Sequence, residues 1–402
     1  MADYLHLFNS VTDFTESYNG NDYHEPWVSL ILSENRVDYN KVPLQPLTFS
    51  ILSDGNIGWK AYNSSSVRTI QYSKNGGEWT DITSTTEGVT IPVVTGDVLK
   101  FKGDTWPGSE YNNYSKFTST CTFAASGNPG SLKYGEETYG DEALAASCYY
   151  GLFEGCKFMN SAPELPATTL VSDCYFHMFY GCTSLTTAPE LPATTLANQC
   201  YREMFYGCTS LTTAPELPAT TLAGLCYECM FENCTSLTTA PELPATTNLP
   251  NGCYFRMFGG CTSLISPPEL PATTFNTNQY QVSQYYQMFK GCTGLTTAPD
   301  LPVTTLTQNC YYGMFENCTS LTTAPELPAT TLKNNCYSRM FSGCTNLNYI
   351  KCLATDISAT DCTSNWVNGV AGTGTFVKPA STDWSSKTGN DGIPSGWTVQ
   401  GA

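Results

Sequence analysis

The sequence predicts an α+β fold dominated by a solenoid, in which similar units are stacked one after another. Two observations support this prediction. The eleven residues LTTAPELPATT occur four times without change, at 185–195, 211–221, 237–247 and 321–331. A nearly constant step between units is typical of solenoids, because each unit buries its apolar side against the next. The steps are 26, 26, 26, 27, 31, 26 and 26 residues for the cysteine at Cys156, Cys182, Cys208, Cys234, Cys261, Cys292, Cys318 and Cys344.

The unit at 200–222 shows what each repeat is expected to contain. Its first apolar residues follow the pattern i, i+1, i+4, i+5 and i+8, which predicts a helix of about two turns with one apolar face. An extended stretch follows, with a short strand expected at 211–213. Pro215 and Pro218 lack N–H donors, so this stretch cannot be a fully paired central strand. The residues of the apolar pattern are Cys200, Tyr201, Met204, Phe205 and Cys208.

The repeated pattern F-x-x-C-x-x-L, followed by an extended threonine-rich stretch, resembles the BspA-like subclass of leucine-rich repeats. The resemblance covers about residues 145–350 and recurs eight times. The A-P-E-L-P stretch replaces the more regular strand of that family. The resemblance implies a leucine-rich-repeat-like solenoid that serves adhesion or recognition and has no catalytic activity. Such repeats resemble surface proteins of gut anaerobic bacteria and proteins of the phages that infect them.

Two further parts are expected ahead of the repeats. Residues 1–45 are expected to form a short α+β module. Because so few residues can hardly bury a core of their own, this module is expected to anchor the chain to a partner. Residues 46–130 contain six or seven short runs of alternating apolar and polar residues, which predict a small all-β sandwich. Within this part, Asn75-Gly76-Gly77 is a strong hairpin signal.

The remaining boundaries follow from where the repeat period begins and ends. The solenoid, with eight coils, is expected to span residues 131–351. Residues 352–402 leave the period, and a solenoid end needs a cap because its last apolar face has no further unit to cover it. The bulky side chains Trp366, Trp384 and Trp397 are expected to supply that cap.

The charge of the chain excludes several classes of partner. It has 18 Lys+Arg against 35 Asp+Glu, for a formal net charge of −17. Nucleic acid requires a basic footprint, so no nucleic-acid partner is expected. No run of 18 apolar residues is present, which argues against membrane insertion. The first 20 residues do not combine a basic start with an apolar run, so no export signal is expected in them.

Most of the 19 cysteines recur at two positions of the repeat. Cysteines repeated in this way are expected to be free thiols that act as small apolar side chains. Stacked units bring equivalent Cα atoms to about 5 Å, a separation that disulfides also tolerate, so oxidation is the alternative. The first position comprises Cys148, Cys174, Cys200, Cys226, Cys253, Cys310 and Cys336, and the second comprises the eight cysteines that define the steps above.

Two neighbouring positions of the predicted helix vary while the rest of the unit repeats. Equivalent positions of stacked units lie in a line, so these residues are expected to form one strip, here called the variable ridge. Its aromatic and arginine residues are types that interfaces favour, which makes them binding candidates. Drift at solvent-exposed positions is the alternative. The binding candidates are Phe176, His177, Arg202, Glu203, Phe255, Arg256, Tyr286, Tyr312 and Arg339, and the other members of the ridge are Glu228, Cys229, Gln287, Gly313 and Ser338.

The step of 31 residues marks an insertion at 275–283. Insertions in solenoids form loops on one face, often the binding face. Phe275, Asn278 and Tyr280 are therefore further binding candidates.

The acidic residue of the A-P-E-L-P stretch also recurs in every unit. Stacking would place these carboxylates about 5 Å apart, where a cation bound between them would offset their repulsion. A solvated column screened by salt is the alternative, and no metal site is expected. This acidic column comprises Glu164, Glu190, Glu216, Glu242, Glu269, Asp300 and Glu326.

The sequence contains no G-x-S-x-G, phosphate-loop or H-E-x-x-H motif, so a non-enzymatic protein without a cofactor is expected. Together with the resemblance, this predicts a recognition or display protein. A phage virion fibre or capsid-decoration protein is expected, made in the host cytoplasm and joined to other virion proteins through residues 1–45. Its partner would be a host-surface glycan or protein, and oligomerisation stays open. The alternatives are a bacterial cell-surface adhesin and a purely structural virion component.

Overall fold

The computed structural model describes residues 44–136, 143–244, 248–275 and 283–402, so the predicted module at 1–45 falls almost wholly outside the described residues. The chain divides into two compact units, Met1–Leu44 and Gln45–Ala402, and only the second is described below. Its described residues are β-rich, as predicted. Their helices are short, namely α3 (Ser131–Tyr134) and the 3-10 segments η2 (Ser64–Ser66) and η3 (Gly389–Asp391). The helical part of the α+β prediction is therefore wrong for the described residues.

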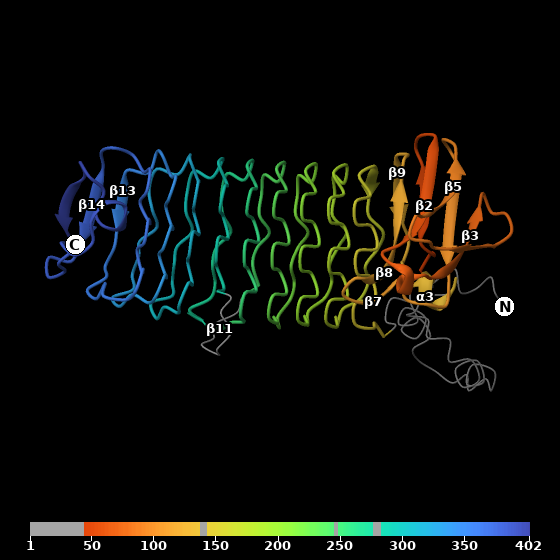
Figure 1. The fold of residues 1–402 in the computed structure, drawn as a ribbon, viewed down its shortest axis with the longest axis horizontal. Coiled ribbons are helices and arrows are strands. Elements are labelled where there is room, and N and C mark those ends of the chain that lie inside the picture. The colour runs from red at the N-terminus through yellow and green to blue at the C-terminus, as the bar shows by residue number, and fades with distance from the viewer. Residues whose placement is uncertain (1–43, 137–142, 245–247, 276–282) are drawn as a thin grey trace, which may run out of the picture. The chain divides into compact units, whose positions relative to one another are not determined.

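The first part of this unit holds two sheets (Figure 1). The larger sheet has the strand order β10-β9-β1-β6-β3-β4, and the smaller has the order β5-β2-β8-β7. The strands of the larger sheet are β1 (Thr48–Ile51), β3 (Thr69–Lys74), β4 (Thr80–Thr83), β6 (Val98–Lys102), β9 (Phe123–Ser126) and β10 (Met159–Ser161). Those of the smaller sheet are β2 (Gly55–Ala61), β5 (Val89–Val93), β7 (Gly108–Glu110) and β8 (Asn113–Ser119).

The two sheets share a core of aromatic rings. Phe49 on β1 lies with its ring centroid 4.9 Å from that of Phe117 on β8, and Trp59 on β2 is also 4.9 Å from Phe117. Strands β3 and β4 pair as an antiparallel hairpin after a turn in which Asn75 and Gly76 have φ values of 54° and 73°. This confirms the predicted hairpin, because such a turn requires positive φ at its central residues.

The segment predicted as a helix is instead a run of overlapping turns with a period of four residues. Gln199, Glu203 and Gly207 have φ values of 57°, 52° and 69°, which a right-handed helix does not allow. Alternate N–H groups bond locally: that of Met204, for example, donates to the carbonyl three residues earlier. The N–H of Phe205 donates to Met230 O, in the next repeat, at 3.0 Å. Bonds between repeats thus take the place of helical bonds.

Neighbouring repeats lie side by side (Figure 1), and backbone bonds and single bridges join them. The extended stretch predicted as a strand at 211–213 pairs through the single parallel bridges Thr187–Thr213 and Thr213–Thr239. A second line of bridges includes Thr169–Thr195 and Thr195–Thr221. Later in the chain the pairing involves short strands, namely β11 (Asn248–Leu249) with β12 (Thr274–Phe275), and β13 (Tyr349–Lys351) with β14 (Thr375–Lys378) and β15 (Thr398–Gly401).

The repeated residues form the core between these repeats. Tyr201 lies with its ring centroid 5.8 Å from that of Tyr175 and 5.9 Å from that of Tyr227, and the rings are nearly parallel. Phe residues and thiols form similar columns, and all 19 cysteines are buried free thiols. The thiol of Cys208 donates to Phe179 O in the preceding repeat at 3.1 Å, and six other repeats have an equivalent bond. In the first repeat, the thiol of Cys156 donates instead to Phe117 O on β8 at 3.2 Å.

Residues after 351 continue this core for part of their length. Trp366 is fully buried, and its ring stacks on that of Trp384 at 5.5 Å. Its indole N–H donates to Gly392 O at 2.8 Å, and that of Trp397 donates to Ala371 O at 2.7 Å. The predicted boundaries at 130 and 351 stay predictions. Within the described part of the chain, no helix has the length and apolarity that crossing a membrane requires.

Candidate functional site: the variable ridge

The variable ridge is the site at which the structure brings most of the predicted residues together. In its first half, the ring of Phe176 stacks on that of Tyr150 at 4.7 Å and is buried. The guanidinium of Arg202, from the next repeat, lies 5.0 Å from the centroid of the Phe176 ring. Glu228 occupies the equivalent position in the next repeat, and its Oε2 lies 3.0 Å from the Nε of Arg202. Equivalent residues of four successive repeats therefore form one continuous column.

The second half of the ridge is aromatic. The rings of Phe255 and Tyr286 stack at 4.9 Å, and those of Tyr286 and Tyr312 stack at 4.6 Å. All three side chains are half-buried, so their edges reach the surface while their faces cover one another. Arg339 lies beside this stack with 47% of its side chain exposed.

Charged side chains tie the repeats of the ridge together. Glu203 contacts both His177, at 2.8 Å between Oε2 and Nε2, and Arg202, at 3.3 Å between Oε1 and Nε. Further along, Arg256 reaches Glu232 at 2.5 Å. Glu316 binds Arg339 at 2.7 Å and Lys290 at 3.1 Å. Each of these carboxylates is mostly buried, which makes the geometry of its partner cation well defined.

One column of this site was not predicted from the sequence. Glu232, Lys290 and Glu316 occupy the position directly after the repeated Met-Phe pair, and Tyr180 and Tyr206 hold it in earlier repeats, where their rings stack at 4.7 Å. This position follows the two ridge positions by four and three residues, so a helix would also place it beside the ridge, as the observed turns do. The spacing was therefore a usable signal in the sequence, and it was not applied to this position.

Burial and neighbouring charge set the ionisation of these carboxyl groups. Burial raises the pKa of Glu228 to about 7; Arg202 opposes this effect, and Glu203 and Glu232 add to it. Burial also raises the pKa of Glu232 above its ordinary value. For Glu203, burial acts in the same direction, but the hydrogen bond and charge of His177, together with Arg202, outweigh it and lower the pKa.

These shifts predict a pH-dependent contribution of Glu228 to stability. Its folded pKa of about 7 lies above the ordinary 4.5, so its contribution is present at low pH and is lost as pH rises through about 7. Glu228→Gln should therefore gain stability relative to wild type between pH 5 and pH 8, by on the order of 1–2 kcal/mol. Thermal unfolding of both proteins at the two pH values measures this. The matched control is Glu216→Gln on the exposed acidic column, and an equal change in both variants would contradict the prediction.

The other sequence-predicted candidates lie elsewhere. Phe275 is buried, and its ring makes edge contacts with those of Tyr285 and Tyr311 at 5.7 and 5.6 Å, so its side chain belongs to the core. Asn278 and Tyr280 fall outside the described residues.

The acidic column is exposed at every member that was predicted for it. Its last member, Glu326, forms an ion pair with Lys351 at 2.7 Å. Among residues 44–136, 143–244, 248–275 and 283–402, no group of three or more His, Cys, Asp or Glu side chains is arranged to hold a metal ion.

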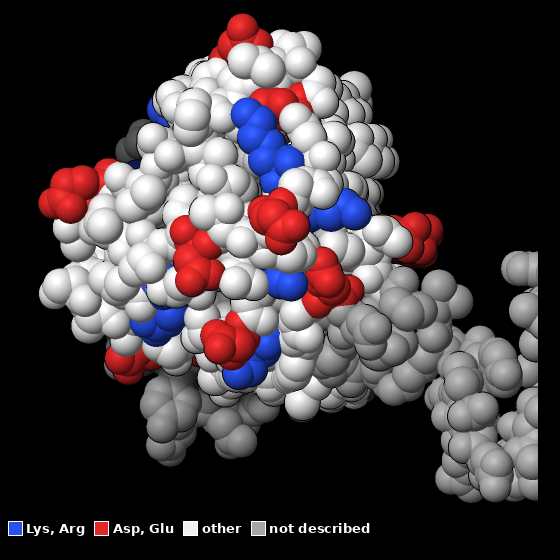
Figure 2. Space-filling model, turned by 90° about the vertical axis from the view of Figure 1, so that its right-hand side faces the viewer, with Lys and Arg blue, Asp and Glu red and all other residues white. Residues whose placement is uncertain are grey.

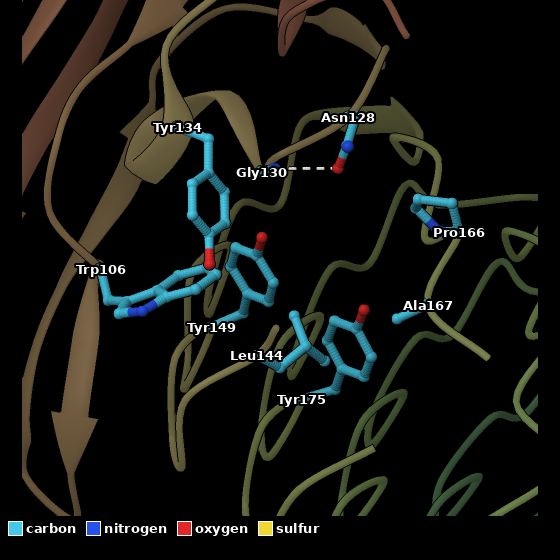
Figure 3. Close-up of a pocket in the computed structure, with 9 residues that line it drawn as sticks. All are labelled: Trp106, Asn128, Gly130, Tyr134, Leu144, Tyr149, Pro166, Ala167 and Tyr175. Carbon is cyan, nitrogen blue, oxygen red and sulfur yellow. Dashed lines mark hydrogen bonds between the residues drawn. The ribbon is translucent and has the colours of Figure 1, made fainter. Parts of the chain in front are cut away.

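An aromatic pocket lies where α3 meets the first repeats (Figure 3). Trp106, Tyr134, Tyr149 and Tyr175 line it, together with smaller residues. Its interior has room for only about 10 Å³, which is the space of one water molecule. The side chains thus fill this pocket themselves, and it serves packing.

The surface seen in Figure 2, at the end of the unit that carries the two sheets, shows acidic and basic side chains interspersed on a largely uncharged surface. Comparison with protein-family models, with curated proteins and with solved structures found no match to the chain.

Proposed function

We propose that the chain is a non-enzymatic recognition and display protein whose residues 131–351 form a BspA-like, leucine-rich-repeat-like solenoid of eight coils. Backbone bonds between successive repeats support this architecture, as do the unbroken columns of Tyr and Phe side chains and the thiols that donate to the preceding repeat. Stacked repeats make a long surface rather than a single cleft, which suits recognition of an extended partner.

The observation that carries the proposal is the contrast between the frame and the variable ridge. The frame, meaning the repeated Tyr, Phe, Met and Cys side chains of the core, is buried and cannot contact a partner. The ridge changes from repeat to repeat, and its aromatic edges and cations reach the surface. Ser338 shows that a small side chain is compatible with this position of the repeat. Three successive repeats nevertheless have an aromatic residue there, namely Phe255, Tyr286 and Tyr312. These are side chains that binding surfaces favour.

The second half of the ridge is also pre-organised for binding. The buried carboxylate of Glu316 holds both Lys290 and Arg339, while about half of the Arg339 side chain stays exposed. Cations held in this way lose little conformational freedom when a ligand binds, which favours affinity. We therefore place the main contact region at Tyr286, Tyr312 and Arg339.

We further propose that the protein belongs to a phage virion, as a fibre or capsid-decoration protein, and that residues 1–45 attach it to other virion proteins. The resemblance to BspA-like repeats supports this assignment. The 19 free thiols also support it, because proteins that are made and assembled in the cytosol keep their cysteines reduced. The ridge would then face a glycan or protein of the host surface.

A glycan array probed with the full chain tests the recognition proposal. The double variant Tyr312→Ser and Arg339→Gln keeps side chains that this chain already uses at equivalent positions, Ser338 and Gln287, so it should fold. It is expected to bind at least about tenfold more weakly, equivalent to about 1.4 kcal/mol. Glu216→Gln, on the acidic column, is the control and should bind as wild type does.

Two results would count against this proposal. Equal binding by the double variant and wild type would remove the ridge as the recognition surface. Failure of the wild-type chain to bind both the array and host cells would favour a purely structural component of the virion.

A further inference from the structure

A second candidate site is a cleft of about 660 Å³ within the unit Gln45–Ala402. It lies between the turn before β3, the segment that leads into β7, the helix α3 and the chain that enters the first repeat. It is open to solvent, so a ligand would lie along its wall and would not be enclosed. The residues that matter for its chemistry are Val67, Arg68, Thr105, Trp106, Ser109 and Lys133.

Two cations line this cleft without a carboxylate partner among the described residues. The guanidinium of Arg68 is fixed by the carbonyls of Ser65 and Val67, at 3.3 and 3.0 Å, and by the side chains of Ser109 and Asn113, each at 3.3 Å. Lys133 donates from Nζ to the carbonyl of Asp104 at 2.7 Å. None of the ion pairs found in the described part of the chain includes either residue.

These two positive charges are notable because the chain has a net charge of −17. The cations of the variable ridge are offset by Glu203, Glu232 and Glu316, whereas no ion pair among the described residues includes Arg68 or Lys133. A cleft that concentrates unpaired charge of one sign attracts a ligand of the opposite sign. The two Nη atoms of Arg68 already donate to four protein acceptors, so Arg68 would attract an anion by its charge and not by a bidentate pair. Lys133 Nζ has three N–H donors and uses one of them on Asp104 O, so it would donate directly to a carboxylate of the ligand.

The other lining residues narrow the class of ligand. The indole of Trp106 is held by edge contacts with Tyr134 and Tyr149, at 5.5 and 5.3 Å and nearly perpendicular (Figure 3). Val67, which is 40% exposed, adds apolar surface, and Thr105 and Ser109 add hydroxyl groups. An aromatic plane, hydroxyl groups and cations together suit a sugar that carries carboxylates, because its C–H face is apolar and its edge is polar.

We propose that this cleft binds an acidic saccharide of the uronic acid type. Its carboxylates would lie at Arg68 and Lys133, the apolar face of one sugar ring against Trp106, and its hydroxyl groups at Ser109 and Thr105. This site is separate from the variable ridge, so either surface binds whether or not the other does.

Calorimetric titration of the full chain with a galacturonic acid trimer and with a galactose trimer tests the proposal. The acidic trimer should bind, with an affinity that falls as salt is added, and the neutral trimer should bind at least about tenfold more weakly. The double variant Arg68→Gln and Lys133→Gln should lower the affinity for the acidic trimer about tenfold or more. Lys157→Gln, which removes an exposed lysine of the first repeat, should bind as wild type does.

The single variant Lys133→Gln keeps the test decisive if the double variant does not fold, since it loses only one side-chain hydrogen bond. It should still weaken binding of the acidic trimer measurably. Three results would overturn the proposal: no binding of the acidic trimer, equal affinity for both trimers, or no effect of the cleft variants. If a tetra-aspartate peptide bound more tightly than the acidic trimer, the ligand of this cleft would be an acidic peptide and not a saccharide.

Discussion

Replacing Phe205 by alanine is expected to lower the free energy of unfolding by about 3–5 kcal/mol, as is typical for a buried phenylalanine. The side chain is fully buried, and its ring lies 5.5 Å from that of Phe179 and 5.6 Å from that of Phe231. Truncation therefore removes contacts with both neighbouring repeats and leaves a cavity between them. Equilibrium unfolding in urea, followed by circular dichroism, measures the change.

The chain itself offers a matched control for this prediction. Phe158 is also a phenylalanine of a repeat, but 45% of it is exposed. Phe158→Ala makes the same chemical change and is expected to cost less than about 1 kcal/mol. If the two substitutions cost the same, burial between repeats would not be what stabilises this part of the chain, and the stacked arrangement would be wrong.

The burial of the repeated residues could be predicted from the sequence because it depends only on which positions are apolar and recur. Cys200, Met204 and Cys208 lie inside whether the backbone has a period of 3.6 or of four residues. Over nine residues these two periods place the same side chains on one face, so the pattern could not distinguish them. The helix prediction failed for this reason. The deciding factor is the bonding of alternate N–H groups to the next repeat, which no local pattern contains.

In the sheets that precede the repeats, some strands could likewise be predicted from the sequence and others could not. The runs around Ile57 and Ile91 alternate clearly, and they form β2 and β5. Strand β8 was not predicted, although it supplies Phe117 to the centre of the core. Its sequence NYSKFTS has few apolar residues. It is a strand because β2 and β7 pair with it on its two sides.

For the candidate site, the sequence could predict which residues vary but not what they contact. Phe255, Tyr286 and Tyr312 do stack, as their equivalent positions suggested. By contrast, the buried carboxylates of Glu232 and Glu316, which hold the ridge cations, were assigned no role. Their contacts run between repeats, for example from Arg339 back to Glu316. The spacing of three and four residues already places this column beside the ridge, but which charges pair between repeats depends on side-chain conformations that the pattern does not contain.

Replacing Gly207 by valine is expected to lower the free energy of unfolding by about 2–3 kcal/mol, because a β-branched residue strongly disfavours positive φ. Gly207 has a φ of 69°, and its N–H donates to Glu232 O in the next repeat at 2.8 Å. A side chain has space there, since a Cβ atom at this position would meet only Gly181 Cα, at 3.9 Å. The cost should therefore come from the backbone conformation and not from crowding.

The repeats suggest the control for this last prediction. Asparagine occupies the equivalent position at Asn233 and Asn317, where φ is 62° and 64°. Asparagine tolerates this conformation better than other residues with a side chain, so Gly207→Asn should cost less than about 1 kcal/mol. Urea unfolding of both variants separates the two explanations. A penalty confined to valine would mean that left-handed residues at every fourth position hold the turns in shape, whereas an equal penalty for both would indicate crowding between repeats.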